Sequence, residues 1–227
     1  MPGLIANVLA VIIGAFLGLF IKNGLSVRFK SMVTNAIGLS CLFIGAAGAF
    51  RGLLGDGSHP VLFIISLVLG GLLGEFIDLD ARLNGFGLIV EQKLGKEGFA
   101  KGFVTSSLLF NVGSMAIIGS LEAGLMGSYN TLFAKSTLDG VTAVVLAASY
   151  GFGVIFSAAT VFLYQGSLIL LAQFVQPFMS DDAVRELSIV GGILIFAIGI
   201  DMLGIKKLKV ANFLPALFVP VVFYAIF

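Results

Sequence analysis

Long apolar stretches follow one another along the whole chain, and each is close to the length of a transmembrane helix. A bilayer core about 30 Å thick needs roughly 20 apolar residues per helix. The pattern predicts an all-α, polytopic transmembrane helical bundle with seven or eight membrane segments. The stretches lie at residues 3–21, 31–50, 60–76, 102–120, 138–152, 154–176, 186–204 and 210–227.

Residues 138–176 admit two interpretations. At a rise of about 1.5 Å per residue, one helix would be nearly twice as long as the bilayer core. Two short helices would instead meet at residues 149–153. With two crossings, ten of the 13 Lys and Arg residues fall on one side of the membrane, and with one crossing only eight do. Because cytoplasmic loops carry an excess of Lys and Arg, the count favours eight spans with both termini outside.

An internal repeat accompanies this pattern. Residues 38–45 align without gaps on residues 192–199, an offset of 154. Carried outward, the offset pairs the first three apolar stretches with the last three, each pair running in opposite directions. This predicts an inverted-topology repeat in one transmembrane domain, 1–227, with halves of roughly 1–120 and 138–227. The alternative is that membrane helices align through shared composition alone.

The two remaining segments resemble each other more weakly, and small and polar residues interrupt both. Residues 111–114 interrupt one segment and residues 149–153 the other. We therefore expect broken or short helices at 104–120 and 138–157, which in secondary transporters mark the substrate site near the bilayer midplane.

Composition supports a membrane location and excludes several classes of protein. The chain is 59% hydrophobic and 11% charged, with a mean hydropathy of +1.12, so no folded soluble domain fits beside the spans. A net charge of +1 provides no basic surface for nucleic acid. Cys41 and His59 are the only cysteine and histidine, so a His/Cys metal site is excluded. A site made of carboxylates alone stays open.

Signatures of enzymes are absent, and no cofactor is implied. The sequence contains no Ser-His or Cys-His pair and no Gly-rich phosphate loop. We therefore expect a protein that is not an enzyme. Without an ATP site, uphill transport would have to be coupled to an ion gradient.

Polar residues inside the spans are the candidates for function, because each costs free energy in the bilayer. Asp139 has a simpler interpretation as a helix N-cap beside Ser136 and Thr137, and Asp201 as half of an interfacial ion pair. The hydroxyl and amide residues could serve only helix packing. The candidates for ion coupling are Glu122, Asp139 and Asp201, and those for substrate binding are Asn7, Asn111, Ser114, Ser149, Tyr150, Ser157 and Gln165.

One stretch of sequence resembles a known family. The runs 113–127 (Gly-Ser-Met-Ala-Ile-Ile-Gly-Ser-Leu-Glu-Ala-Gly-Leu-Met-Gly) and 135–140 (Lys-Ser-Thr-Leu-Asp-Gly), followed by 151–158 and 164–167, are similar to a bacterial membrane-protein family catalogued as domain of unknown function 554. The resemblance covers essentially the whole chain. It implies an inner-membrane protein, described in that family as a transporter candidate, and it carries over no substrate.

These observations lead to a small secondary transporter of an unidentified solute or ion in the bacterial cytoplasmic membrane. The alternative is a passive channel or a non-transporting scaffold. The expected partners are the lipid bilayer and the solute. A homodimer would supply buried surface for the Gly-rich helix faces. Nucleic acid is not expected as a partner.

Overall fold

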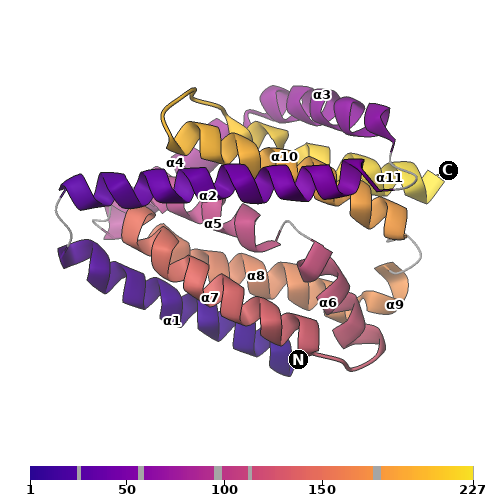
Figure 1. Ribbon diagram of the computed structural model, residues 1–227, viewed down its shortest axis with the longest axis horizontal. Helices are drawn as coiled ribbons and strands as arrows, with labels where there is room; N and C mark the ends of the chain where they lie inside the picture. Colours follow the sequence, from indigo (N-terminus) through magenta and orange to yellow (C-terminus); the bar gives the residue numbers. More distant parts are fainter. Residues whose placement is uncertain (25–26, 56–58, 95–98, 112–113, 176–179, 227) are drawn as a thin grey trace. The chain divides into compact units, whose positions relative to one another are not determined.

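The computed structural model describes residues 1–24, 27–55, 59–94, 99–111, 114–175 and 180–226. Within these ranges the chain is helical and contains no β-strand, as the hydropathy pattern predicts (Figure 1). The elements are α1 (Pro2–Gly24), α2 (Val27–Leu53), α3 (Pro60–Ile77), α4 (Leu79–Leu94), α5 (Phe99–Asn111), α6 (Ser114–Leu125), α7 (Asn130–Tyr150), α8 (Gly153–Leu170), α9 (Ala172–Val175), α10 (Asp181–Met202), the 3-10 helix η2 (Val210–Leu217) and α11 (Phe218–Ile226).

Six of the described helices are long and apolar enough to cross a membrane: α1, α2, α3, α7, α8 and α10. A seventh span results if α5 and α6 are taken together, with a bend of 58° between them. This bend confirms the predicted break in the segment 104–120. The chain is therefore a polytopic, all-α membrane protein.

The region 138–176 contains two long helices, α7 and α8, separated at Gly151 and Phe152, followed by the short helix α9. Gly151 has a φ of 84°, a conformation that residues with a Cβ rarely adopt. The expected start at residue 138 was wrong, because α7 begins at Asn130 and is 21 residues long. Asp139 therefore lies nine residues past the helix start and is not an N-cap. The helix continues through two charged residues because they pair with each other.

Two further segments differ from the hydropathy pattern. Residues 79–94, which lie outside the predicted membrane segments, make the 16-residue helix α4. The last apolar stretch is helical from Val210 to Ile226 and is shorter than the six long spans. Its first half is the 3-10 helix η2, which contains Pro215, and a proline removes one backbone donor and disfavours an α-helix.

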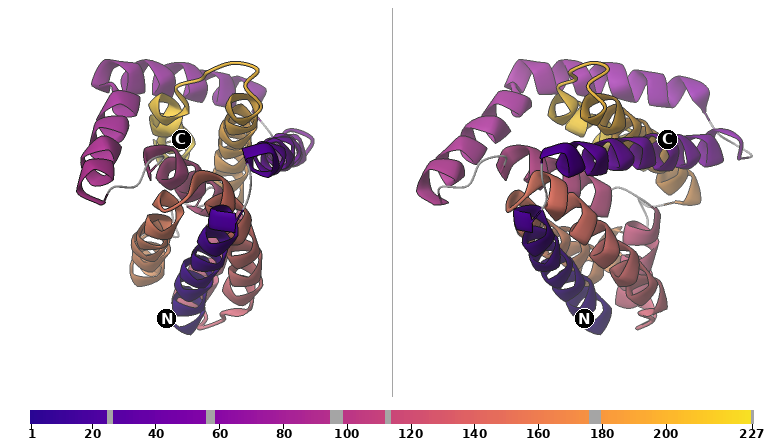
Figure 2. Two further views of the ribbon diagram at one scale, coloured as in Figure 1. Left: turned by 90° about the vertical axis from the view of Figure 1, so that its left-hand side faces the viewer. Right: turned by 60° about the vertical axis from the view of Figure 1, so that its left-hand side comes forward.

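The chain forms two compact units, and each combines segments that are far apart in the sequence. Unit 1 comprises residues 1–37, 83–111 and 115–173, and unit 2 comprises residues 38–82, 112–114 and 174–227. In unit 1, α1 lies along α7 (Figures 1 and 2). Gly3 meets Leu132 and Gly18 meets Ala147, so the two helices are parallel. Leu4 lies against Gly166 of α8 and belongs to the same buried cluster as Ile169, and Asn7 donates a hydrogen bond to Gln165.

In unit 2, α2 crosses α10 through four glycines. Gly199 lies against the carbonyl oxygen of Gly38, and Gly45 and Gly192 each lie against the carbonyl oxygen of the other. Because the residue numbers rise on one helix as they fall on the other, the helices are antiparallel. The offset of 154 maps Gly38 onto Gly192 and Gly45 onto Gly199, so it exchanges the two contacts. The inverted repeat stays a prediction, and this exchange is what a two-fold relation between its halves requires.

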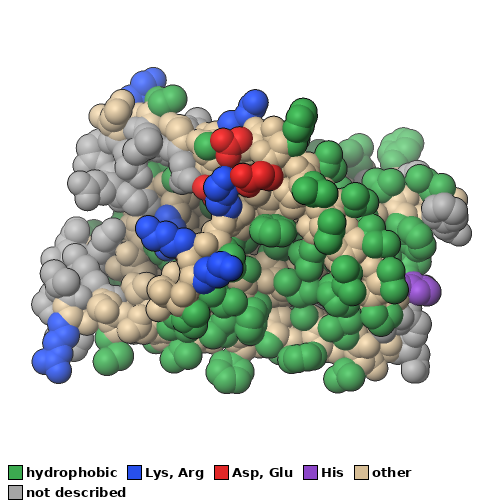
Figure 3. Space-filling view, turned by 90° about the horizontal axis from the view of Figure 1, so that it is seen from above, with side chains coloured by type: hydrophobic (Ala, Val, Ile, Leu, Met, Phe, Trp, Pro, Cys, Tyr) green, Lys and Arg blue, Asp and Glu red, His purple; other side chains and the backbone are tan. Residues whose placement is uncertain are grey.

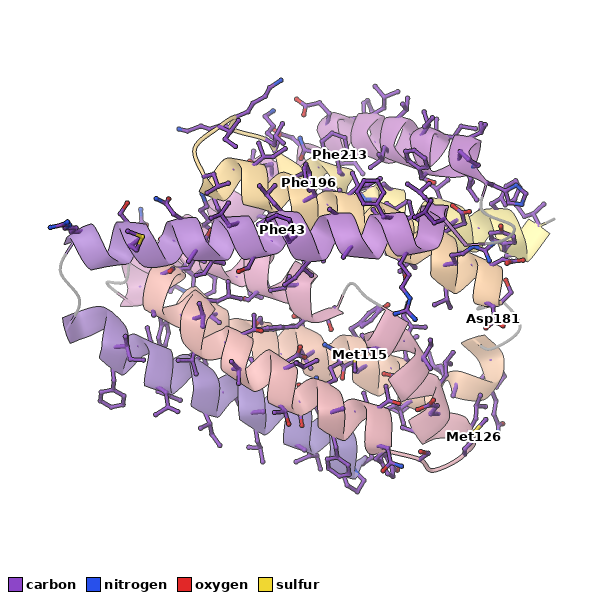
Figure 4. The ribbon with its side chains drawn as sticks, in the orientation of Figure 1. Phe43, Met115, Met126, Asp181, Phe196 and Phe213 are labelled. Atoms are coloured by element: carbon purple, nitrogen blue, oxygen red, sulfur yellow. The ribbon has the colours of Figure 1, made fainter. Side chains whose placement is uncertain are left out.

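Unit 2 also packs α3 against η2. Gly70 and Gly74 face the backbone of Ala216 and Asn212, and Phe213 lies against Gly71 (Figure 4). The other side of α3 carries exposed apolar residues such as Leu72 and Phe76. Hydrophobic side chains cover much of the face shown in Figure 3, while acidic and basic side chains gather in one part of it. Such a surface suits contact with lipid.

Candidate functional site

The contact between α1 and α7 brings polar groups into the interior of unit 1. A Cβ added at Gly14 would collide with the carbonyl oxygen of Gly140, and one at Gly18 with that of Val144. The absence of side chains at these glycines lets the two backbones touch, as small residues do in membrane helix pairs. Residues on the facing surfaces of α1 and α7 are consequently sealed from the surroundings.

A buried ion pair lies next to this contact. The ammonium nitrogen Nζ of Lys135 is 2.8 Å from Oδ1 and 2.6 Å from Oδ2 of Asp139, one helical turn further along α7. Both side chains are only 8% exposed. Burial disfavours both charges and their mutual attraction opposes that penalty, so neither group is stable there without the other.

Two amides from other helices complete the cluster. Nδ2 of Asn7 on α1 donates to Oδ2 of Asp139 at 3.0 Å and to Oε1 of Gln165 on α8 at 3.2 Å. Asn7 and Gln165 are fully buried. Among the described residues, Oδ1 of Asn7 and Nε2 of Gln165 have no hydrogen-bond partner. The cluster thus contains one buried acceptor and one buried donor without a hydrogen-bond partner among the described residues. Burying such unsatisfied groups costs free energy of folding.

The structure therefore unites three of the predicted candidates, Asn7, Asp139 and Gln165. Sequence analysis did not rank Lys135 among the site residues, although it lay in the motif used for the resemblance. Its spacing of four residues from Asp139 on one helix was the available signal. This spacing could not be used as a signal, because a helix that starts at residue 138 does not contain Lys135.

A second polar cluster connects α5 and α8. Nδ2 of Asn111 donates to the Ser107 carbonyl at 3.0 Å and to Oγ1 of Thr160 at 3.1 Å. The Thr160 hydroxyl is 3.0 Å from that of Ser107 and donates to the Ser157 carbonyl at 2.8 Å. Oδ1 of Asn111 is buried without a partner among the described residues. Asn111 ends α5, so this acceptor lies at the helix break.

The other candidates for substrate binding are placed differently. The hydroxyl of Ser157 donates to the Val154 carbonyl within α8, as a residue used for packing would. The Ser149 hydroxyl is buried near the end of α7 and has no partner among the described residues. Tyr150 is buried at the end of that helix, with Nζ of Lys101 5.8 Å from its ring centre. Ser114 begins α6, and its side chain lies outside the described residues.

The two remaining acidic candidates are not part of the buried pair. Oε2 of Glu122 accepts a hydrogen bond of 2.6 Å from Thr131, which precedes Lys135 by one turn of α7. Asp201 lies in the last turn of α10 and belongs to unit 2. Across the described residues, no three His, Cys, Asp or Glu side chains come together as ligands for a metal ion.

Unit 2 contains a buried carboxylate that sequence analysis missed. Glu186 of α10 is fully buried, and its Oε1 accepts a 2.7 Å hydrogen bond from the backbone N–H of His59, just before α3. This contact ties the start of α3 to α10. The sequence did offer a signal, because Glu186 is the first residue of the predicted stretch 186–204, but it was not counted among the candidates; α10 begins five residues earlier, at Asp181.

Comparisons with known proteins agree with the membrane architecture. The uncharacterized membrane protein YdfK of Bacillus subtilis is 40% identical over 97% of this chain and 94% of its own length. The uncharacterized protein YqgA of Escherichia coli is 29% identical over 93% of this chain and 91% of its own. No solved structure matches the chain significantly. Residues 2–225 match the family described as "Protein of unknown function (DUF554)", and the chain belongs to that family of membrane proteins.

Proposed function

We propose that this membrane protein is a small ion-coupled secondary transporter, in which the Lys135–Asp139 pair on α7 carries the coupling ion. The observation that supports this most strongly is the pair itself, with both side chains 8% exposed inside a membrane-spanning helix. Ionisable residues in such positions line ion pathways and proton relays in many membrane proteins.

The energetic argument favours a function over simple packing. On insertion scales each charged residue near the centre of a membrane helix costs about 2.5–3.5 kcal/mol. Replacing a buried ion pair by apolar residues of similar volume is often neutral or stabilising. A scaffold would gain nothing from Lys135 and Asp139 that leucine or methionine could not supply. A transporter needs a group whose charge changes when an ion binds.

The helix break at the end of α5 supports a solute pathway. Broken helices in secondary transporters free backbone and side-chain groups for the substrate, and here the break follows Asn111, whose Oδ1 is buried without a partner among the described residues. The exchange of the Gly38–Gly199 and Gly45–Gly192 contacts by the repeat offset supports the same class, because inverted repeats are common in such proteins.

Flux through proteoliposomes tests the proposal. A thermal-shift screen of the purified protein against cations and small metabolites identifies ligands, since a bound ligand raises the stability of the folded state. Each hit is then followed as a labelled solute under an imposed ion gradient. We expect uphill uptake by the wild type, no uphill uptake by Asp139→Asn, and normal uptake by Asp181→Asn, which alters an exposed carboxylate at the start of α10 (Figure 4).

The other outcomes distinguish the alternatives. Flux that only follows the solute gradient, with no response to a second ion, would indicate a channel. Unchanged uphill uptake by Asp139→Asn would remove the pair from the coupling mechanism. If the wild type carries no solute and Asp139→Asn changes only the melting temperature, the protein is a scaffold and the buried pair serves assembly.

A further inference from the structure

Several N–H donors lie around the buried pair. The Lys135 ammonium carries three N–H groups, and the amide of Asn7 already donates to Asp139 and Gln165. Nε2 of Gln165 is a further donor, buried and without a partner among the described residues. Ammonium and amide N–H groups are the usual ligands of carboxylates and other small anions. The one carboxylate present, that of Asp139, now fills the place of that anion.

We propose that Lys135 becomes the binding site of a small monoanion, such as a carboxylate solute, whenever Asp139 takes up a proton. This inference rests on the proposed transport function and names its substrate class: the protein would move one proton together with one monoanion. The proton enters at Asp139, and the anion replaces the ionised Asp139 carboxylate beside the Lys135 ammonium.

The cost of an unpaired buried charge makes proton uptake and anion binding depend on each other. In the structure, Lys135 and Asp139 sum to zero charge. A proton that forms an O–H bond on Asp139 leaves a buried net charge of +1 on Lys135, and one monoanion returns the sum to zero without oxidation or reduction. The intermediate with only one of the two bound contains an unpaired charge inside a membrane span, which is strongly unfavourable. The cost of that intermediate couples the anion to the proton.

The same arithmetic argues against a metal cation as the transported ion. A cation next to Asp139 would lie beside the Lys135 ammonium, 2.6 Å from the same carboxylate oxygen, and two positive charges there would repel each other. Displacing the lysine would need other oxygen ligands. The described residues supply one spare acceptor in this cluster, Oδ1 of Asn7, whereas hard cations take six or more oxygen ligands.

Other charged or titratable groups near α7 lie towards its ends or on its neighbours. At the start of α7, Thr131 holds the Glu122 carboxylate of α6 at 2.6 Å, and Thr131, Lys135 and Asp139 follow each other at four-residue intervals on one helix face. The remaining groups of this kind on the described parts of α1, α5, α7 and α8 are the Met1 amino group with Tyr129, Lys101 with Tyr150, and Tyr164.

The variant Asp139→Asn imitates the protonated state and tests the inference directly. Purified protein is melted with increasing sodium formate and, in parallel, with formamide, a neutral molecule of similar size, at constant ionic strength. We expect formate to raise the melting temperature of Asp139→Asn by about 3–6 °C at ten times its dissociation constant. Formamide should raise it by much less. Wild type at pH 7.5 and the double variant Lys135→Met/Asp139→Asn should not respond to formate.

If Asp139→Asn does not fold, the wild type at about pH 5 replaces it, where formate is still an anion and Asp139 is nearer to protonation. Equal responses to formate and formamide, or a formate response that survives in the double variant, would overturn the anion site. The result also separates this inference from the transport proposal. Formate binding without any flux would reject transport and keep the site, whereas coupled flux without formate binding would keep transport and reject the monoanion.

Discussion

Two lysine–carboxylate pairs of nearly equal length lie in very different surroundings. The shortest N–O distance is 2.6 Å in Lys135–Asp139 and 2.8 Å in Lys209–Glu75. The side chains of the first pair are each 8% exposed, and those of the second are 54% and 61% exposed. Solvent screens an exposed pair and leaves it with little effect on stability, whereas each partner of a buried pair depends on the other. Distance alone does not indicate which ion pair matters.

Breaking the buried Lys135–Asp139 pair, here called the inner pair, should have the largest effect on stability. Lys135→Met leaves the Asp139 carboxylate buried without its counter-ion, and we expect it to lower the free energy of unfolding by about 3–5 kcal/mol. Lys135→Met/Asp139→Leu removes both charges and should recover most of that loss. Thermal unfolding in detergent of the wild type and the three variants, including Asp139→Leu, gives the coupling energy. A double variant no more stable than Lys135→Met would show that the pair is not the source of the effect.

Separating α1 from α7 should weaken the protein without touching either charge. Gly14→Ala places a Cβ against the carbonyl oxygen of Gly140, and we expect a loss of about 1–3 kcal/mol from the strain. The matched control is Gly48→Ala on α2, whose Cβ would meet only the Gly192 Cα, at 3.7 Å. That change should be neutral or stabilising, because alanine favours a helix more than glycine does. Equal melting temperatures for the two variants would contradict the close approach.

Removing the amide that supports the inner pair should have a smaller effect. Asn7→Leu deletes the hydrogen bonds to Asp139 and Gln165, and we expect a loss of about 1–2 kcal/mol, the range for hydrogen bonds to a charged group and between membrane helices. Asn35→Leu, at an exposed position of α2, serves as the control and should change little. The comparison fails if the exposed asparagine proves the more important of the two in thermal unfolding.

Mutation of the exposed Lys209–Glu75 pair, the outer pair, should have the smallest effect on stability. Lys209→Met should leave the melting temperature close to that of the wild type, because both partners are exposed. The hydrogen bond and the negative charge of Glu75 raise the pKa of Lys209. Any contribution of the pair is therefore complete at neutral pH, and on the alkaline side it is lost as the pH rises through this raised pKa. A large loss of stability at pH 7, or one that high salt does not reduce, would contradict this interpretation.

Sequence reasoning located the membrane segments better than their limits. The apolar stretches identify α1, α3 and α10 within a few residues, since lipid demands about 20 apolar residues whatever the packing. The start of α7 was misplaced by eight residues because Lys135 looked like a loop residue. A pattern of single residues does not register that two charges a turn apart compensate each other, so the helix was expected to begin between Lys135 and Asp139.

For the candidate site as well, the sequence identified single residues but not which of them meet in the fold. Asn7, Asp139 and Gln165 were recognised one by one as polar residues in apolar spans. In the sequence, however, Asn7 is 132 positions from Asp139 and 158 from Gln165, its two hydrogen-bond acceptors. Asn111 and Thr160 are brought together in the same way. Nothing local in the sequence pairs them. Glu186 was missed because its burial depends on the backbone of His59 in a distant loop.

The sequence by itself determined the solvent of this protein, its helical class and its family, because these depend on composition, on the length of apolar runs and on local motifs. Only the tertiary structure decided which polar groups share an interior. The glycine contacts between α1 and α7 bury Lys135 and Asp139 together, while Lys209 and Glu75 stay at the surface. The free energy of a charge depends on its surroundings in space, and those surroundings come from residues far away in the chain.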